Sequence, residues 1–310
     1  MLIPFARRAI ALKIETTVGV DASPDPTVDG LLIFNGSSSI DTDTVDRPLD
    51  SAVFGADEFL TALPSGVIQG QIELLGASTL GVAAPIGQAL RIGGFAETLV
   101  ATTSATYNLV SEALETATVD FWHSGTFMKL LGARAQISGV GFTIGGRLVA
   151  DIRIEGAAVN NKVTEDSLPT QDLSAFRSPP LANSANTTLT VNSFDVEGFS
   201  ASFDLGTAIV TKEHTEAVVT QITGRSGTFS AGFYRPAISS LDVYALKNAH
   251  TQFPIAITVN GGATKITTVT AAKNQIDTIA HQEREEEFGY QINGRRLRNG
   301  TGGELVIAFT

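Results

Sequence analysis

Polar and apolar residues alternate along most of the chain, and this period of two constrains the fold more than any other feature. In residues 147–155, Leu148, Ala150, Ile152 and Ile154 lie on one face, and the opposite face is largely charged. Such alternation is typical of antiparallel strands with one buried face. The pattern recurs in residues 67–74, 199–205, 228–234, 255–259 and 305–309. The sequence therefore predicts a mainly β protein.

Two segments have helical rather than strand spacing. Residues 107–121 place apolar side chains one, three and four positions apart, and residues 239–250 do the same. We predict short flanking helices in both segments, the second capped by Ser239 or Ser240, with Asp242 favourable to the helix dipole. Asn-Gly pairs at 260–261 and 293–294 predict tight hairpin turns.

A polar, proline-containing segment divides the chain almost evenly. Residues 159–185 show no sustained period and contain Pro169, Pro179 and Pro180. The expected order of strands and helix is similar on the two sides of this segment. We therefore predict two similar tandem β domains: residues 1–160 with an N-terminal arm, a linker at 161–185, and residues 186–310.

The charge balance limits what the protein can bind. The chain has 21 Lys and Arg against 32 Asp and Glu, which gives a formal net charge of −11. This negative charge argues against a protein that binds nucleic acid tightly, because such binding depends on cationic side chains that neutralise phosphates. It does not argue against a protein past which nucleic acid slides. Charged residues make up only 17% of the chain, which is low for a soluble monomer and favours subunit interfaces.

The sequence contains no complete catalytic or metal-binding pattern. The chain has no Cys and only four His, so thiol chemistry is impossible and a His-rich metal site is not expected. The acidic run 41–46 fails as a calcium loop because Asp46 stands where that loop needs Gly. Neither a dinucleotide-binding fingerprint nor a nucleophile elbow occurs, and the carboxylates offer no way to choose a glycosidase pair. We expect a protein that is not an enzyme and has no cofactor.

Nothing in the sequence predicts a membrane span or a signal peptide. No run approaches the roughly 18 apolar residues of a span, and Arg7, Arg8 and Lys13 interrupt the apolar N-terminal stretch. We expect synthesis in the cytoplasm.

One stretch resembles the tail tube (major tail) proteins of long-tailed bacteriophages. It begins at residues 127–135 and continues through 142–156 as two strands joined by a Gly-rich corner. In that family a helix precedes a K-L-L-G-like segment, and the second strand ends in an E-G or similar pair. The residues that fit are Lys129, Leu130, Leu131, Gly132, Gly145, Gly146, Glu155 and Gly156.

The resemblance implies a β-sandwich whose sheets join between subunits into a continuous barrel. Rings of six chains, or of three two-domain chains, would stack into the virion's tail tube. DNA would pass through this tube during genome ejection without specific binding. The implied partners are copies of the chain, the tail tip and tail terminator proteins, and a tape measure protein in the lumen. The chain would be made in the host bacterial cytoplasm, and we prefer the ring of three.

Two sets of candidate residues follow from this resemblance. A negatively lined conduit would repel a polyanion, so acidic residues on polar strand faces are candidates for the lumen. Ring stacking needs segments that reach along the tube axis, and the polar segment 41–50, the N-terminal arm through Lys13 and the linker are candidates. The lumen candidates are Asp151, Glu155, Asp195, Glu197 and Asp204; the inter-ring candidates are Asp41, Asp43, Asp46, Arg47 and Pro48.

A β-sandwich adhesin or carbohydrate-binding virion module is the alternative. It would share the all-β class and the turn-rich composition. Sugar sites usually need exposed aromatic side chains, however, and the chain has one Trp and four Tyr against 17 Phe.

Overall fold

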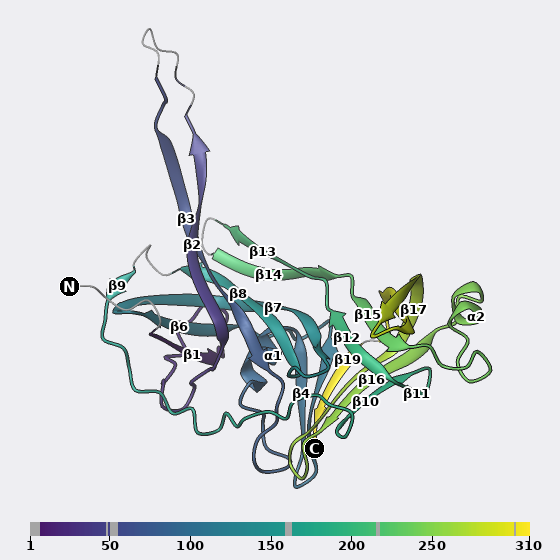
Figure 1. The fold of residues 1–310 in the computed structure, drawn as a ribbon. Helices are drawn as coiled ribbons and strands as arrows, with labels where there is room; N and C mark the ends of the chain where they lie inside the picture. Colours follow the sequence, from purple (N-terminus) through teal and green to yellow (C-terminus); the bar gives the residue numbers. More distant parts are fainter. Residues whose placement is uncertain (1–6, 48, 50–54, 159–162, 215–217, 301) are drawn as a thin grey trace.

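The computed structural model describes residues 7–47, 49, 55–158, 163–214, 218–300 and 302–310, with only the backbone at 41–43 and 62–64. This part of the chain is mainly β, in large antiparallel sheets (Figure 1), as the alternation predicts. Its two helices, α1 (Gly87–Ile92) and α2 (Val243–Asn248), have six residues each. Neither of these described helices is long and apolar enough to cross a membrane.

The strands fall on both sides of the polar segment 159–185. Those before or within it are β1 (Arg8–Ile14), β2 (Phe34–Asp46), β3 (Phe59–Glu73), β4 (Phe95–Val100), β5 (Ser104–Val110), β6 (Ala117–His123), β7 (Thr126–Thr143), β8 (Val149–Ala158) and β9 (Thr164–Glu165). Those after it are β10 (Thr187–Val191), β11 (Phe194–Val196), β12 (Gly198–Asp204), β13 (Thr207–Glu213), β14 (Val218–Arg225), β15 (Thr228–Tyr234), β16 (Phe253–Asn260), β17 (Ile266–Arg284), β18 (Glu287–Arg296) and β19 (Gly302–Phe309).

The predicted helix at 107–121 is wrong. Residues 104–110 form β5 and 117–123 form β6, with a turn between them. Along β5, Ala105, Tyr107 and Leu109 are buried and alternate with partly exposed residues, whereas β6 is buried on both faces. A strand buried on both faces loses its alternation, so two strands and a turn imitated helical spacing.

The second predicted helix is confirmed in a shorter form, as α2. Its N-cap is Asp242, not a serine: the carboxylate accepts hydrogen bonds from the backbone N–H groups of Tyr244 and Ala245. The turn predicted at 260–261 joins β16 to β17. The turn predicted at 293–294 is wrong, because Asn293 and Gly294 lie inside β18. There a side chain on Gly294 would collide with the carbonyl oxygen of Gln275 on the neighbouring strand.

The two halves of the chain repeat one order of strand pairing. Before the polar segment, the antiparallel pairs follow the order β1-β6-β7-β8-β3-β2. After it, they follow β10-β16-β17-β18-β15-β12. In each half a short helix comes after the fifth strand of this order: α1 after β3, and α2 after β15. The inserted hairpins differ, since β4 and β5 have no counterpart in the second half.

Two long strands, β7 and β17, connect the layers of a sandwich-like body. Near their starts, β7 pairs with β6 and β17 pairs with β16, which belong to one set of strands. Near their ends, β7 pairs with β8 and β17 pairs with β18, which belong to the other set. Apolar side chains from both sets form one continuous core, to which Phe121, Ile152, Phe203 and Ile292 contribute.

The segment predicted as a linker is docked on the body. Arg177 donates hydrogen bonds to the carbonyls of Gly76 and Ala77 and to that of Thr264, which joins loops from both halves of the chain. Phe176 packs against the core, and the Gln171 side chain binds the carbonyl of Ile10. Residues 159–162 of this segment lie outside the described chain. The domain boundaries remain a prediction.

Candidate assembly surfaces

Eight strands form one antiparallel sheet in the order β2-β3-β8-β7-β12-β15-β18-β17, which we call the wall. It is continuous because the end of β7 pairs with β12, which joins four strands from each half of the chain. One face of the wall packs on the core through residues such as Ile68, Ile152, Phe229 and Ile292. The other face is polar, and the β13–β14 hairpin covers part of it over β7 and β8.

Amide and hydroxyl side chains dominate the polar face. In the first half they line a groove of about 410 Å³ that includes Gln69, Gln71, Gln136 and Ser138. In the second half they line a groove of about 590 Å³ that includes Ser202, Thr228, Ser230 and Asn293. Gln71 donates to Asp151, and Ser230 bonds Asn293 on the adjacent strand. Charges of both signs are interspersed: Asp151 and Arg153 in one groove, Asp204 and Arg295 in the other.

The joint between β7 and β12 has a defined register. Thr143 lies opposite Ser200, Gly141 opposite Ser202, and Val140 opposite Phe203. Backbone hydrogen bonds extend the joint at its end, from the Ile144 N–H to the Phe199 carbonyl and from the Gly145 N–H to the Ala182 carbonyl. The joint is therefore built chiefly from backbone groups, and the strands approach so closely at Gly141 that a side chain there would collide with the backbone of Ala201 and Ser202.

Three of the five lumen candidates lie on the polar face of the wall. Asp151 is exposed on β8, and Asp204 is exposed at the end of β12, where it accepts a hydrogen bond from the Gly206 N–H. Glu155 shares the face of Asp151 but is buried, because the β13–β14 hairpin covers it and Thr211 donates to its carboxylate. The sequence could not reveal this cover, since β13 lies more than fifty residues away.

The other two candidates lie outside the wall. Asp195 is exposed on β11, which pairs with β10, and it accepts a hydrogen bond from Thr190. Glu197 lies between β11 and β12, and its backbone carbonyl accepts from the Tyr234 N–H. The structure therefore does not bring all five acidic residues to one surface.

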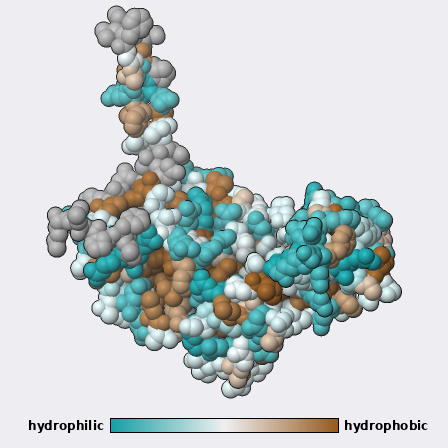
Figure 2. Space-filling view, viewed as in Figure 1, coloured by the Kyte–Doolittle hydropathy of each residue, from teal (hydrophilic) through white to brown (hydrophobic). Residues whose placement is uncertain are grey.

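A long hairpin formed by β2 and β3 projects from the body (Figure 1). β3 pairs with β8 only from Ser65 onward, so residues 59–64 pair with β2 alone. At about 3.3 Å per residue, this unsupported part extends about 20 Å before the tip. The space-filling view shows it standing clear of the body, with hydrophobic residues among hydrophilic ones (Figure 2).

Three of the five inter-ring candidates are in β2 of this hairpin rather than in the polar loop that we expected. Asp41, Asp43 and Asp46 belong to β2, and only the backbone is described at 41 and 43. Alternation in β2 was hidden because polar Ser, Thr and Asp residues occupy both faces of its sequence pattern, and Asp is uncommon in strands. Arg47 forms an ion pair with Glu58 across the hairpin. Pro48 lies outside the described residues.

Exposed apolar side chains occupy both ends of the molecule. Near the hairpin tip, Val45, Leu49, Phe59 and Leu60 are each more than half exposed. At the opposite end, where the C-terminus lies (Figure 1), the exposed apolar side chains belong to the end of β4 and to the loop packed against the β4–β5 turn. They are Val82, Leu99 and Val100.

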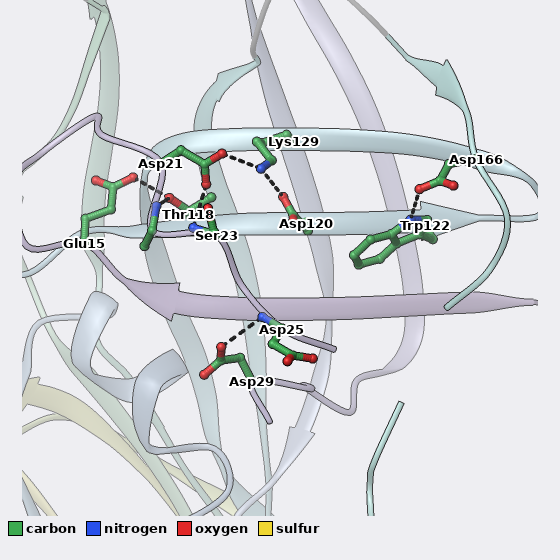
Figure 3. Close-up of polar contacts among 11 residues, drawn as sticks. Glu15, Asp21, Ser23, Asp25, Asp29, Thr118, Asp120, Trp122, Lys129 and Asp166 are labelled. Atoms are coloured by element: carbon green, nitrogen blue, oxygen red, sulfur yellow. Dashed lines mark hydrogen bonds and ion pairs between the residues drawn. The ribbon is translucent and has the colours of Figure 1, made fainter. Parts of the chain in front are cut away.

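The K-L-L-G segment lies in β7 and fastens the loop that follows β1 (Figure 3). Lys129 bonds Asp21 at 2.6 Å and lies 3.5 Å from Asp120. Burial raises the pKa of Asp120 to about 6, against the lowering effect of the Lys129 charge. For Asp21, burial raises the pKa, but the hydrogen bonds from Lys129 and the Ser23 backbone bring it below its usual value.

The glycine of this segment has a different partner. Its N–H donates to the carboxylate of Glu15, which also accepts from the Gly19 N–H and from the hydroxyls of Thr116 and Thr118. Gly132 has a positive φ of 60°, which glycine adopts without strain. Sequence analysis did not single out Glu15, because nothing local distinguishes it from an exposed glutamate.

The sequence matches no protein-family model and no curated protein. Only the geometry of these surfaces therefore bears on function.

Proposed function

We propose that this protein is a structural subunit that assembles with its own copies into stacked rings, forming the tail tube of a long-tailed bacteriophage. In this proposal the two halves of the chain are tandem tube-type domains. The polar face of the wall lines the bore through which the genome is ejected.

The observation that carries the proposal is the wall. An antiparallel sheet with two open edges can bind further strands, because the unpaired backbone N–H and C=O groups at each edge can pair with another strand. Among the described residues, no strand pairs with the outer edge of β2 or with the outer edge of β17 beyond residue 276. Copies joined at these edges would close the sheet into a barrel.

The chemistry of the polar face supports passage of DNA without capture. Its side chains are mainly amides and hydroxyls, and Arg153 and Arg295 each share a groove with an aspartate. A surface without clustered cations releases few counterions on contact with DNA and so gains little affinity. The net charge of −11 adds repulsion of phosphate over a longer range.

The projecting hairpin supports stacking. A two-stranded hairpin is at best marginally stable in water, and this one exposes Val45, Phe59 and Leu60. Contact with the next ring would bury them, and the apolar residues at the opposite end of the molecule offer a surface for that contact. The tail tip and tail terminator proteins would cap the two ends of the tube, and a tape measure protein would occupy the lumen.

The number of chains per ring follows from the repeat. Each chain supplies two four-stranded units with equivalent pairing, so three chains would give a ring of six such units. We favour this ring over one of six chains.

Electron microscopy of the purified protein at high concentration tests the proposal. Negatively stained samples should contain rings or tubes with a central bore, and class averages should show threefold symmetry with six similar units. A protein that stays monomeric at every concentration, with specific binding on a glycan array, would contradict the proposal and support the adhesin alternative.

A further inference from the structure

The repeated pairing assigns a partner and a register to the two open edges of the wall. We infer that, in the ring proposed above, the end of β17 in one copy pairs antiparallel with β2 of the next copy, with Gln282 opposite Ser37. This inference rests on the proposed assembly and specifies its contact.

The template is the joint inside the chain. There, β7 pairs with β12, and Gly141 lies opposite Ser202. By position in the repeat, β17 corresponds to β7 and β2 corresponds to β12. A joint of β17 with β2 therefore repeats between copies what β7 with β12 makes within one copy.

The register on the β17 side comes from its pairing with β18. Ile279 pairs with Ile292, as Ile137 pairs with Ile152 in the first half. Three residues before Ile292, Gly289 pairs with Gln282. Three residues before Ile152, Val149 pairs with Gly141. Gln282 thus occupies the position of Gly141. Because a Cβ on Gly141 would collide with the backbone of β12, the pairing at Gln282 needs a wider strand spacing than the internal joint has there.

The register on the β2 side follows in the same way. Ile152 pairs with Gly70 of β3, and Ile292 pairs with Ala231 of β15. One residue earlier, Gln69 pairs with Ser37 and Ser230 pairs with Ser202. Ser37 thus occupies the position of Ser202, and Gln282 should lie opposite Ser37.

Both edges are chemically open to this pairing. Ser37, Ser38 and Ser39 are exposed, and this part of β2 has none of the charges or prolines that usually protect an edge. On β17, Ala280 and Gln282 are exposed too. Helix α2 packs on β17, but it does not prevent this pairing. In the first half, α1 packs on β7 in the corresponding way, and β7 still pairs with β12.

Cysteine cross-linking tests the register, and the natural chain contains no Cys to interfere. In the variant S37C/Q282C, the two thiols of one chain lie at opposite edges of the wall, about 34 Å apart along the sheet at about 4.8 Å for each of the seven strand spacings. Any disulfide between these positions must therefore join two copies. Oxidation of assembled rings should convert most of the chain into covalent multimers that a reductant reverses.

Three further experiments serve as controls for the cross-link in S37C/Q282C. A mixture of S37C and Q282C single variants should stop at dimers, and neither should cross-link alone. S37C/A280C should not cross-link, because diagonal Cβ atoms lie about 7–8 Å apart and a disulfide needs about 4 Å. T143C/S200C should lose its free thiols within one chain, because these residues already face each other at the internal joint.

The two hypotheses fail separately. Rings that form by electron microscopy while S37C/Q282C stays uncross-linked, or cross-links no better than S37C/A280C, would overturn this register and leave the assembly standing. Absence of rings and of cross-links together would overturn both.

Discussion

At the scale of single residues, the buried polar groups do most to fix the loop after β1. Glu15 is 8% exposed and accepts four hydrogen bonds from neutral donors, and each carboxylate oxygen has at least one donor from a distant segment. Asp120 is also buried, and one of its oxygens has no hydrogen-bond partner. The two acids therefore respond differently to loss of charge.

Replacing Glu15 by Gln should destabilise the protein despite the equal size of the side chains. The amide NH₂ group would face donors, so two of the four hydrogen bonds would be lost. At about 1.5 kcal/mol or more for each bond to a charged group, the free energy of unfolding should fall by about 3 kcal/mol. Urea denaturation measures this, with the exposed Glu112→Gln as the matched control. Equal stability of the two variants would contradict the network.

Replacing Asp120 by Asn should make stability less dependent on pH. The folded-state pKa of about 6 exceeds the unfolded value, so Asp120 favours the folded state most below pH 4 and progressively less up to about pH 6. D120N should match the natural protein near pH 4 and exceed it at pH 7.5, by at most about 3 kcal/mol for a two-unit shift.

Asp21 is the matched control because it contacts the same lysine and its pKa is lowered. D21N should therefore lose stability above pH 4, the opposite of D120N. Urea titrations at both pH values measure the pair, and parallel behaviour of the two variants would refute the assignment.

At the scale of elements, the hairpin of β2 and β3 differs from the rest of the molecule. The β13–β14 hairpin, which also has only its own pairing, packs on β7 and β8, whereas the outer part of the β2–β3 hairpin packs on no other described strand. Its exposed apolar residues do not help the isolated chain to fold. Their substitution should therefore affect stacking and leave the body intact.

The variant F59S/L60S tests this separation. We expect rings with an unchanged melting temperature but few or no stacked tubes, because the apolar contact between rings is lost. Negative-stain tube lengths and thermal unfolding are the measurements. Val18→Ser, a similarly exposed residue in the loop after β1, is the control and should stack normally. Full-length tubes from F59S/L60S would rule out this role for the hairpin.

At the scale of the whole molecule, backbone pairing and the docked segment 163–185 hold the two halves together. β7 pairs with β12 and β5 pairs with β19, so sheets cross from one half to the other. Arg177 adds a side-chain clamp between a loop of the first half and the β16–β17 turn of the second.

Replacing Arg177 by Ala should lower the free energy of unfolding by about 2–4 kcal/mol, because several hydrogen bonds to a charged group are lost. The loss should appear in urea denaturation, whereas the exposed Arg7→Ala should change little. R177K should recover only part of the stability, since an ammonium group lacks the planar fork of donors. An unaffected R177A would show that backbone pairing alone holds the halves.

By itself, the sequence determined the fold class and most strands, because alternation reports directly which face of a strand is buried. Segments 147–155, 199–205 and 228–234 correspond closely to β8, β12 and β15. It failed at β6, where burial on both faces removes the alternation, and in β2, where Ser, Thr and Asp face solvent on an unsupported hairpin. Both failures have the same cause: the pattern records the surroundings of a strand, not the strand itself.

Only the tertiary structure decided which surfaces are available for assembly. It joined β7 to β12 across more than fifty residues, covered Glu155 with a distant hairpin and left Asp151 and Asp204 open on the polar face. Contacts of this kind depend on strand order and register, which backbone hydrogen bonds set between segments far apart in the sequence. The sequence could nominate acidic residues, but the order of strands decided which of them share a face.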